Sequence, residues 1–158
     1  MKTKGAIKET SLPLPLYNKG KVRDIYELSG GLLIVATDRI STYDVVHPNG
    51  IPDKGKILTQ MSLFWLNKLG KELNIKTHLV TTDLRNYPTI LKPYEEILDG
   101  RSMWVQKADV VPIECVVRGY VAGSAWKEYK EDGSVCGIKL SESLREAEKL
   151  EELIFTPA

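Results

Sequence analysis

Hydrophobic and polar residues alternate from Lys21 to Leu28, a pattern typical of a β-strand with one buried face. A Ser29-Gly30-Gly31 turn follows, and an aliphatic run then extends from Leu32 to Thr37. Two such segments joined by a short glycine turn predict a β-hairpin. A polar stretch and two turn segments, 48–50 and 52–55, separate this hairpin from the next element.

The next element has apolar residues at helical spacing, namely Ile57, Leu58, Met61, Phe64, Trp65 and Leu69. This spacing predicts an amphipathic helix from Gly55 to about Leu73. Aromatic residues on such a stripe usually contribute to the core, and we expect this of Phe64 and Trp65.

The remaining segments complete a mixed pattern. We predict short strands at 77–82, 102–107 and 113–118, a mostly irregular proline-containing stretch between the first two, a helix at 123–129, a turn at 131–134 and a charged helix at 144–153. The order lacks the regular βαβ alternation of a parallel sheet. It predicts an α+β fold in which helices pack against one antiparallel sheet.

Composition narrows the class of protein. The 158 residues are 42% hydrophobic and 27% charged, as expected for one globular domain or part of a larger one. Lys plus Arg number 22 against 21 for Asp plus Glu, so we expect neither nucleic acid nor an anionic membrane as a partner. Oligomeric state stays open, and a homo-oligomer is possible.

The longest apolar run, Leu32–Ala36, is much shorter than the roughly 20 residues that span a bilayer. The first residues contain no apolar stretch typical of a signal peptide. Cys115 and Cys136 show no metal-binding spacing and no disulfide framework. We therefore expect a cytoplasmic protein with two free thiols.

Three polar segments are candidates for chemistry. The first, Lys19–Asp24, places cations around Gly20, where a phosphate can approach the backbone closely. The second, Asp38–Asp44, follows a strand and could bind a polar substrate or a cation. The alternative for the first segment is a solvated basic turn, and for the second a loop whose side chains satisfy its own backbone. The third, 114–124, ends a strand at Arg118 and starts a helix with Ser124 as its expected N-cap, a possible anion site or a simple capped helix.

Nucleophilic catalysis has little support. No zinc-ligand spacing or Gly-x-Ser-x-Gly motif occurs, and we expect His47 and His78 to be turn or strand residues rather than bases. The residues alone favour phosphate or nucleotide handling.

Taken in order, five blocks resemble the SAICAR synthetase (phosphoribosylaminoimidazole-succinocarboxamide synthase) family, from about Tyr17 to Ala158. They are GKVRDIYE, the hairpin that follows it, TDRISTYDVV, IPDKGKILTQMSLFW and VPIECVVRGYVAGSAWKEY. The resemblance implies an ATP-dependent ligase of purine biosynthesis. Its substrates would be L-aspartate and carboxyaminoimidazole ribonucleotide (CAIR), and its intermediate would be an acyl phosphate. ATP and Mg²⁺ would take part, with the metal bridging the phosphates.

The resemblance also implies a two-part fold with a kinase-like ATP cleft, divided into an ATP-binding part, 1–109, and the start of a substrate-binding part, 110–158. ATP would contact Gly20, Lys21, Val22 and Arg23, and the linker from Gln106 to Val110 would offer backbone groups to adenine. Substrate would contact Ser41, Asp44, Lys54, Arg118 and Ser124. No catalytic residue is assigned.

The sequence departs from the family pattern in three respects. The segments Leu140–Leu144 and Leu150–Leu153 lack the prolines and glycine that the family leads us to expect, which leaves the local loop shape open. Gln106 stands where the family leads us to expect lysine, which leaves only backbone contacts at this position. The chain stops at Ala158, before the family's His-Asp-Glu motif and its acidic magnesium ligands, so we expect an N-terminal portion without metal ligands. The alternative from another class is a nucleotide-binding fragment without catalysis. A third hypothesis is a different ATP-dependent phosphotransferase with a similar lobe.

Overall fold

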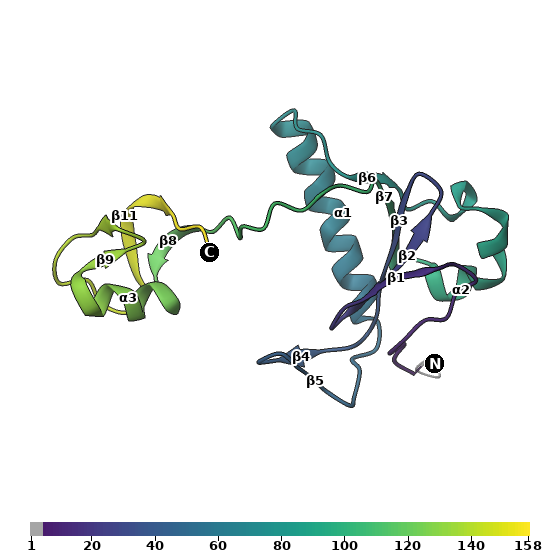
Figure 1. The fold of residues 1–158 in the computed structure, drawn as a ribbon, viewed down its shortest axis with the longest axis horizontal. Helices are drawn as coiled ribbons and strands as arrows, with labels where there is room; N and C mark the ends of the chain where they lie inside the picture. The colour runs from purple at the N-terminus through teal and green to yellow at the C-terminus, as the bar shows by residue number, and fades with distance from the viewer. Residues whose placement is uncertain (1–4) are drawn as a thin grey trace. The chain divides into compact units, whose positions relative to one another are not determined.

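A computed structural model describes residues 5–158, and the chain separates into two compact units. The boundary lies between Ala108 and Asp109, one residue before the division expected after residue 109. Figure 1 shows the five-stranded sheet and the longest helix in the first unit, and a smaller α/β arrangement in the second.

The first unit is organised around an antiparallel sheet with the strand order β1-β2-β3-β7-β6. The strands are β1 (Leu16–Lys19), β2 (Arg23–Leu28), β3 (Gly31–Ala36), β6 (Leu79–Thr81) and β7 (Ser102–Val105). The predicted hairpin is confirmed as β2 and β3, in which Ile25 pairs with Ile34. The predicted α+β class, with an antiparallel sheet, is confirmed as well.

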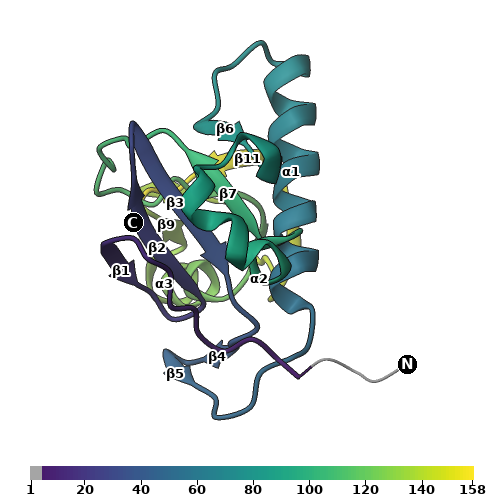
Figure 2. The same cartoon turned by 90° about the vertical axis from the view of Figure 1, so that its right-hand side faces the viewer.

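Side chains alternate between the two faces of this sheet, and one face carries the main core. The core residues are Leu12, Tyr26, Leu28, Leu33, Val35, Tyr87, Leu91 and Leu98. Three of them come from 84–98, which forms two 3₁₀ turns, η1 (Leu84–Asn86) and η2 (Thr89–Tyr94), and the short helix α2 (Glu95–Leu98). The expectation of a mostly irregular stretch here was wrong, because apolar residues at helical spacing fold it into turns that cover the sheet (Figures 1 and 2).

The other face of the sheet meets α1 (Lys54–Glu72), which confirms the predicted helix. Its two buried residues are Gly55 and Thr59. The large apolar side chains lie outside this buried row and are exposed, including Phe64 at 57% and Trp65 at 49%, so their predicted place in the core was wrong.

The close approach of α1 to the sheet explains why Gly55 and Thr59, rather than the large apolar residues, face the strands. A Cβ atom built on Gly55 would lie 2.1 Å from the carbonyl oxygen of Ala36. Only glycine lets the helix backbone come this near, because it has no side chain. Small and polar residues therefore face the strand, and the bulky stripe lies to the side.

A small hairpin lies between β3 and α1 in the sequence. Its strands are β4 (Ser41–Thr42) and β5 (Val45–Val46), and the two residues between them, Tyr43 and Asp44, have φ values of 46° and 67°. Positive φ at both central positions is the requirement of a type I′ turn. The turn therefore fixes where Asp44 is displayed.

The second unit pairs β8 (Val117–Val121) with β11 (Glu148–Phe155), and adds α3 (Ser124–Asp132) and the hairpin β9 (Ser134–Val135) and β10 (Ile138–Lys139). Its core consists of Val121, Ala125, Val135, Leu150 and Ile154. The strand expected from residue 113 begins at Val117 instead.

The charged helix expected at 144–153 was wrong, since most of this segment is β11. Leu150 and Ile154 are buried four residues apart. A spacing of four places two residues on the same side of a helix and also on the same face of a strand, so the spacing does not distinguish them.

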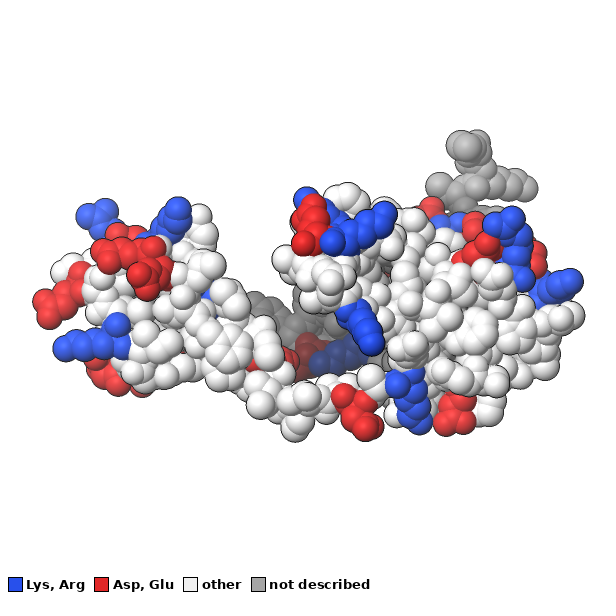
Figure 3. Space-filling model, turned by 90° about the horizontal axis from the view of Figure 1, so that it is seen from above, with Lys and Arg blue, Asp and Glu red and all other residues white. Residues whose placement is uncertain are grey.

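The surface agrees with the balanced composition. Figure 3 shows basic and acidic side chains interspersed on the visible face of each unit. Both cysteines are free thiols, as expected, and both are exposed. In residues 5–158, the structure contains no helix with the length and apolar character needed to cross a membrane.

Candidate nucleotide and anion sites

The loop from Gly20 to Arg23 connects β1 and β2, and two residues beyond β3 hold it in place. The Arg39 guanidinium donates to the carbonyl oxygens of Gly20 at 2.8 Å, Lys21 at 3.0 Å and Arg23 at 3.1 Å. Thr37 donates to the carbonyl of Val22 through its hydroxyl at 2.9 Å and its N–H at 3.1 Å. All four predicted ATP-contacting residues of the loop are therefore fixed by their backbones.

Buried contacts hold Arg39 itself. Its side chain is 9% exposed and forms a 2.8 Å ion pair with Asp24, whose side chain is 1% exposed. Asp24 also accepts from the N–H and the hydroxyl of Thr10. Sequence reasoning placed Arg39 within a candidate segment but assigned it no role. The sequence signal for a role of Arg39 is weak, because an arginine that follows a strand is also common on protein surfaces.

The side chain of Lys21 extends to the β4–β5 turn. Its Nζ lies 2.5 Å from Oδ1 of Asp44, and both side chains are largely exposed. The hydrogen bond and charge of Lys21 lower the pKa of the Asp44 carboxyl below its ordinary value. A residue expected to contact ATP and one expected to contact substrate are thus adjacent.

Two more residues of the predicted substrate-contacting set, Ser41 and Lys54, lie on either side of this turn in the sequence. Ser41 begins β4, and Lys54 is the first residue of α1. In the described part of the chain, no hydrogen bond or ion pair joins Lys54 to Ser41 or Asp44. His47 contacts the Thr42 hydroxyl within the same hairpin, consistent with its expected turn role.

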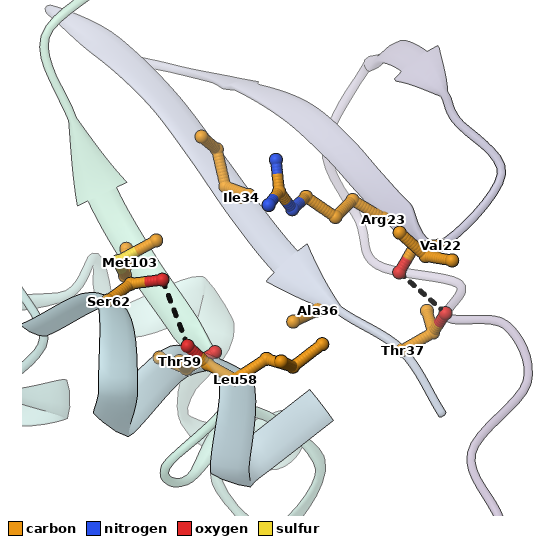
Figure 4. Close-up of a pocket in the computed structure, with 9 residues that line it drawn as sticks. All are labelled: Val22, Arg23, Ile34, Ala36, Thr37, Leu58, Thr59, Ser62 and Met103. Atoms are coloured by element: carbon orange, nitrogen blue, oxygen red, sulfur yellow. Dashed lines mark hydrogen bonds between the residues drawn. The ribbon is translucent and has the colours of Figure 1, made fainter. Parts of the chain in front are cut away.

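A groove runs beside the loop, between the sheet and α1. Its narrow end, about 40 Å³, is lined by Val22, Arg23, Ile34, Ala36, Thr37, Leu58, Thr59, Ser62 and Met103. Figure 4 shows these side chains around the gap between β3 and α1, with Thr37 bonded to Val22. A wider part of about 470 Å³ continues past Met61 and Trp65 to His78. The groove is mainly apolar, and Arg23 contributes a cation to both parts.

Hydrogen bonds of Asp38 join the start of α1 to the segment that follows β3. The buried carboxylate of Asp38 accepts from the N–H of Gly55 at 2.9 Å, from Arg101 at 2.8 Å and from the N–H of Ile7. Burial raises the pKa of Asp38, but the bonds from Arg101, Gly55 and Ile7 outweigh it and the net pKa is lowered. Asp38, which lies outside the helix, therefore satisfies one N–H of the first turn of α1, that of Gly55.

The linker residues Gln106 and Val110 fall in different units. The N–H of Gln106 donates to the carbonyl oxygen of His78 at 2.7 Å, so this N–H is already occupied. Its carbonyl accepts no hydrogen bond from the residues that the structure describes. Val110 is 89% exposed.

In the second unit, the structure brings Arg118 and Ser124 together. The guanidinium of Arg118 donates to the hydroxyl of Ser124 at 3.0 Å and to that of Thr156 at 2.9 Å. Thr156 is 2% exposed, and its hydroxyl lies 3.4 Å from the carbonyl of Val116. Sequence reasoning missed Thr156, because no local pattern marks a residue that contacts Arg118 across a strand pair.

The expectation that Ser124 caps α3 was wrong. Gly123 occupies the N-cap position with φ 60°, and no side chain caps the helix. A positive φ at Gly123 turns the chain sharply enough for Ser124 to begin the helix. The Ser124 hydroxyl is consequently directed to Arg118 instead of to its own helix.

The Gly20–Arg23 loop and the Arg118–Ser124 pair belong to a chain whose residues 16–158 match the sequence model of the SAICAR synthetase family. The chain belongs to the SAICAR synthetase family. It is 56% identical over 151 residues to the phosphoribosylaminoimidazole-succinocarboxamide synthase of Syntrophobacter fumaroxidans, covering 95% of this chain and 50% of that protein. The corresponding Trichlorobacter lovleyi synthase is 54% identical, with 96% and 51% covered.

Solved structures of the family have the same fold. A SAICAR synthase structure superposes with a TM-score of 0.88 at 46% identity, over 96% of this chain and 54% of that one. The Saccharomyces cerevisiae SAICAR synthase complexed with SAICAR gives 0.87, with the same identity and coverage. The chain therefore spans about half the length of the relatives it matches. The resemblance seen in the sequence is confirmed, as is its SAICAR-synthase-like fold.

Proposed function

We propose that this chain is the nucleotide-binding portion of a SAICAR synthetase that joins L-aspartate to CAIR at the expense of ATP. Family membership supports a ligase of purine biosynthesis. The observation that carries the finer proposal is the Gly20–Arg23 loop, whose carbonyls are all turned inward to Thr37 and Arg39. Such a loop presents cations and N–H groups outward, the chemistry that phosphate oxygens require.

In this proposal ATP lies against the loop and the sheet. Lys21 and Arg23 neutralise phosphate oxygens, and Val22 and the apolar groove contact the nucleoside. The unpaired carbonyl of Gln106 accepts a hydrogen bond from the adenine amino group, and Val110 contributes backbone groups. The ion pair of Lys21 with Asp44 opens or is shared when phosphate arrives, because an exposed pair is held only weakly.

The ribonucleotide is assigned to Arg118 and Ser124. Two hydrogen bonds, to Ser124 and Thr156, orient the guanidinium of Arg118 and leave other N–H donors for a phosphate or a carboxylate. Ser41, Asp44 and Lys54 would serve the substrate side of the first unit. Ser41 and Lys54 offer donors, whereas Asp44 is an acceptor held near Lys21.

The reaction follows from these groups by charge neutralisation and positioning. A CAIR carboxylate oxygen attacks the γ-phosphorus, and the bond to ADP breaks. The aspartate amine then attacks the acyl carbon, loses a proton and expels phosphate, leaving an amide. Mg²⁺ would enter with ATP and supply positive charge that offsets the charge of the phosphates. In residues 5–158, no three His, Cys, Asp or Glu side chains gather to hold a metal, so we assign it no ligand in this chain.

A second candidate is a nucleotide-binding fragment without turnover. The coverage of only about half of each relative favours it for the chain by itself. A solved SAICAR synthetase in complex with ADP has a TM-score of 0.62 to this chain at 24% identity, which supports a common fold. The two candidates share the loop site and differ in whether ADP is released.

The test is ADP release by the 158-residue chain with ATP, magnesium, CAIR and aspartate, each omitted in turn. Release that needs all four would support the complete ligase. Nucleotide binding without release would support the fragment. Release without aspartate would contradict both and favour a phosphotransferase, and absence of both binding and release would contradict the nucleotide site.

A further inference from the structure

Among residues 5–158, Arg39 is the one buried cation that reaches most of the Gly20–Arg23 loop, and it contacts the loop only through carbonyl oxygens. Its guanidinium contacts the carbonyls of Gly20, Lys21 and Arg23, and the side chain of Asp24. At 8% exposed, the residue is too enclosed to be the group that meets a ligand. Its effect on a ligand must therefore pass through the loop backbone.

Because the peptide bond is planar, holding a carbonyl in one direction also fixes the direction of the next N–H group. In a trans peptide the N–H points opposite to the carbonyl of the preceding residue. When Arg39 draws in the Gly20 and Lys21 carbonyls, the N–H groups of Lys21 and Val22 turn away from it. In the described part of the chain, neither N–H has a hydrogen-bond partner.

We infer that Arg39, held by Asp24 and assisted by Thr37, is a positioning residue that presents the Lys21 and Val22 N–H groups to the phosphates of a nucleotide. The inference rests on the proposed function and adds the residue that prepares the site before ATP arrives. A preset donor pair needs no reorganisation on binding, which is why fixed N–H groups bind anions well.

Lysine at this position keeps the charge but cannot replace the guanidinium. Three carbonyls and one carboxylate accept from Nε and Nη2 of the same planar group, with distances from 2.8 to 3.1 Å. A single ammonium has no such fork and cannot cover this spread of acceptors. Arg39→Lys should therefore release the loop while preserving net charge.

The structure supplies a matched control in Arg101. It is a second buried arginine of the first unit, paired with buried Asp38 at 2.8 Å, and it also contacts the Ala36 carbonyl. It forms no hydrogen bond to the loop carbonyls. Arg101→Lys should destabilise the unit in a comparable way and leave the loop in place.

The experiment combines two measurements on the 158-residue chain and on both variants. Heteronuclear NOE values of the Lys21 and Val22 amides report loop order without ligand, and calorimetric titration reports binding of magnesium-ATP and of inorganic tripolyphosphate. We expect Arg39→Lys to lower the NOE values of both amides. We also expect it to weaken both ligands by roughly tenfold, the worth of one charge-assisted hydrogen bond. Arg101→Lys should match the wild type in both measurements.

If Arg39→Lys does not fold, Thr37→Val carries the same test. It removes the hydroxyl bond to the Val22 carbonyl and the long 3.4 Å bond from the Arg39 N–H, and leaves the Arg39 guanidinium in place. It should weaken both ligands about two- to fivefold. Unchanged loop order or affinity in a folded Arg39→Lys chain would overturn the inference. An equal loss in Arg101→Lys would overturn it too, since general destabilisation would then explain the effect. A wild type that binds neither ligand would contradict the proposed function itself, and the inference with it.

Discussion

Replacing Gly55 with alanine tests the packing of α1 on the sheet. The new Cβ would lie 2.1 Å from the Ala36 carbonyl oxygen and 2.8 Å from Nη1 of Arg101. Both neighbours are fixed, one by the sheet and the other by its buried ion pair with Asp38. The helix must therefore move away from β3, which also stretches the hydrogen bond from Gly55 N–H to Asp38.

The expected loss can be estimated from three contributions. Overpacking in a well-packed site costs about 1–3 kcal/mol. The strained bond to a carboxylate is worth about 1.5–3 kcal/mol, of which a part is lost. Alanine's better helix propensity returns about 1 kcal/mol. The free energy of unfolding should therefore fall by about 1–4 kcal/mol.

Urea unfolding followed by circular dichroism at 222 nm measures this change. Gly70→Ala is the matched control, because it lies in the same helix and its Cβ would meet only ordinary contacts, Thr77 Cγ2 at 3.4 Å and the Ile75 carbonyl oxygen at 3.6 Å. It should be neutral or slightly stabilising. A Gly55→Ala chain as stable as the wild type would refute the packing argument, and equal losses in both variants would refute its dependence on position.

Three further predictions follow from the site. Asp38 has a lowered pKa in the folded chain, so its contribution to the free energy of unfolding is complete above about pH 4 and is lost as pH falls further. Urea unfolding at several pH values should show that stability depends less on acid pH in Asp38→Asn than in the wild type, and the same dependence in both would contradict this. Lys21→Ala should weaken ATP binding about tenfold by calorimetry and return the Asp44 pKa toward its ordinary value by NMR, whereas unchanged affinity would remove Lys21 from the site. Arg118→Ala should abolish CAIR binding in a titration while ATP binding is kept, and equal loss of both would contradict its assignment.

The sequence predicts most of the first unit because its signals there are local. The hairpin follows from alternation and a glycine turn, and α1 follows from helical spacing. The packed face of α1 could not be predicted in this way. It depends on how closely Gly55 approaches Ala36, a contact between segments distant in sequence. The spacing of Leu150 and Ile154 likewise fits a helix or a strand, and pairing with β8 decides it.

In the candidate site, too, the residues marked by local patterns could be predicted, and those defined by long-range contacts could not. Gly20, Lys21 and Arg23 are recognisable because cations around a glycine form a local pattern. Arg39 and Thr156 act on residues 16 to 38 positions away, and no local pattern marks such partners. The Lys21–Asp44 pair joins two predicted segments, but only the β4–β5 turn shows that they meet.

The most direct test of the account is an amide-resolved NMR titration of the 158-residue chain with magnesium-ATP. The account predicts saturable shifts that are largest at Lys21 and Val22, whose N–H groups are free in the described structure. Shifts confined to other parts of the chain, or none at saturating ATP, would contradict the assignment of this loop to the nucleotide phosphates.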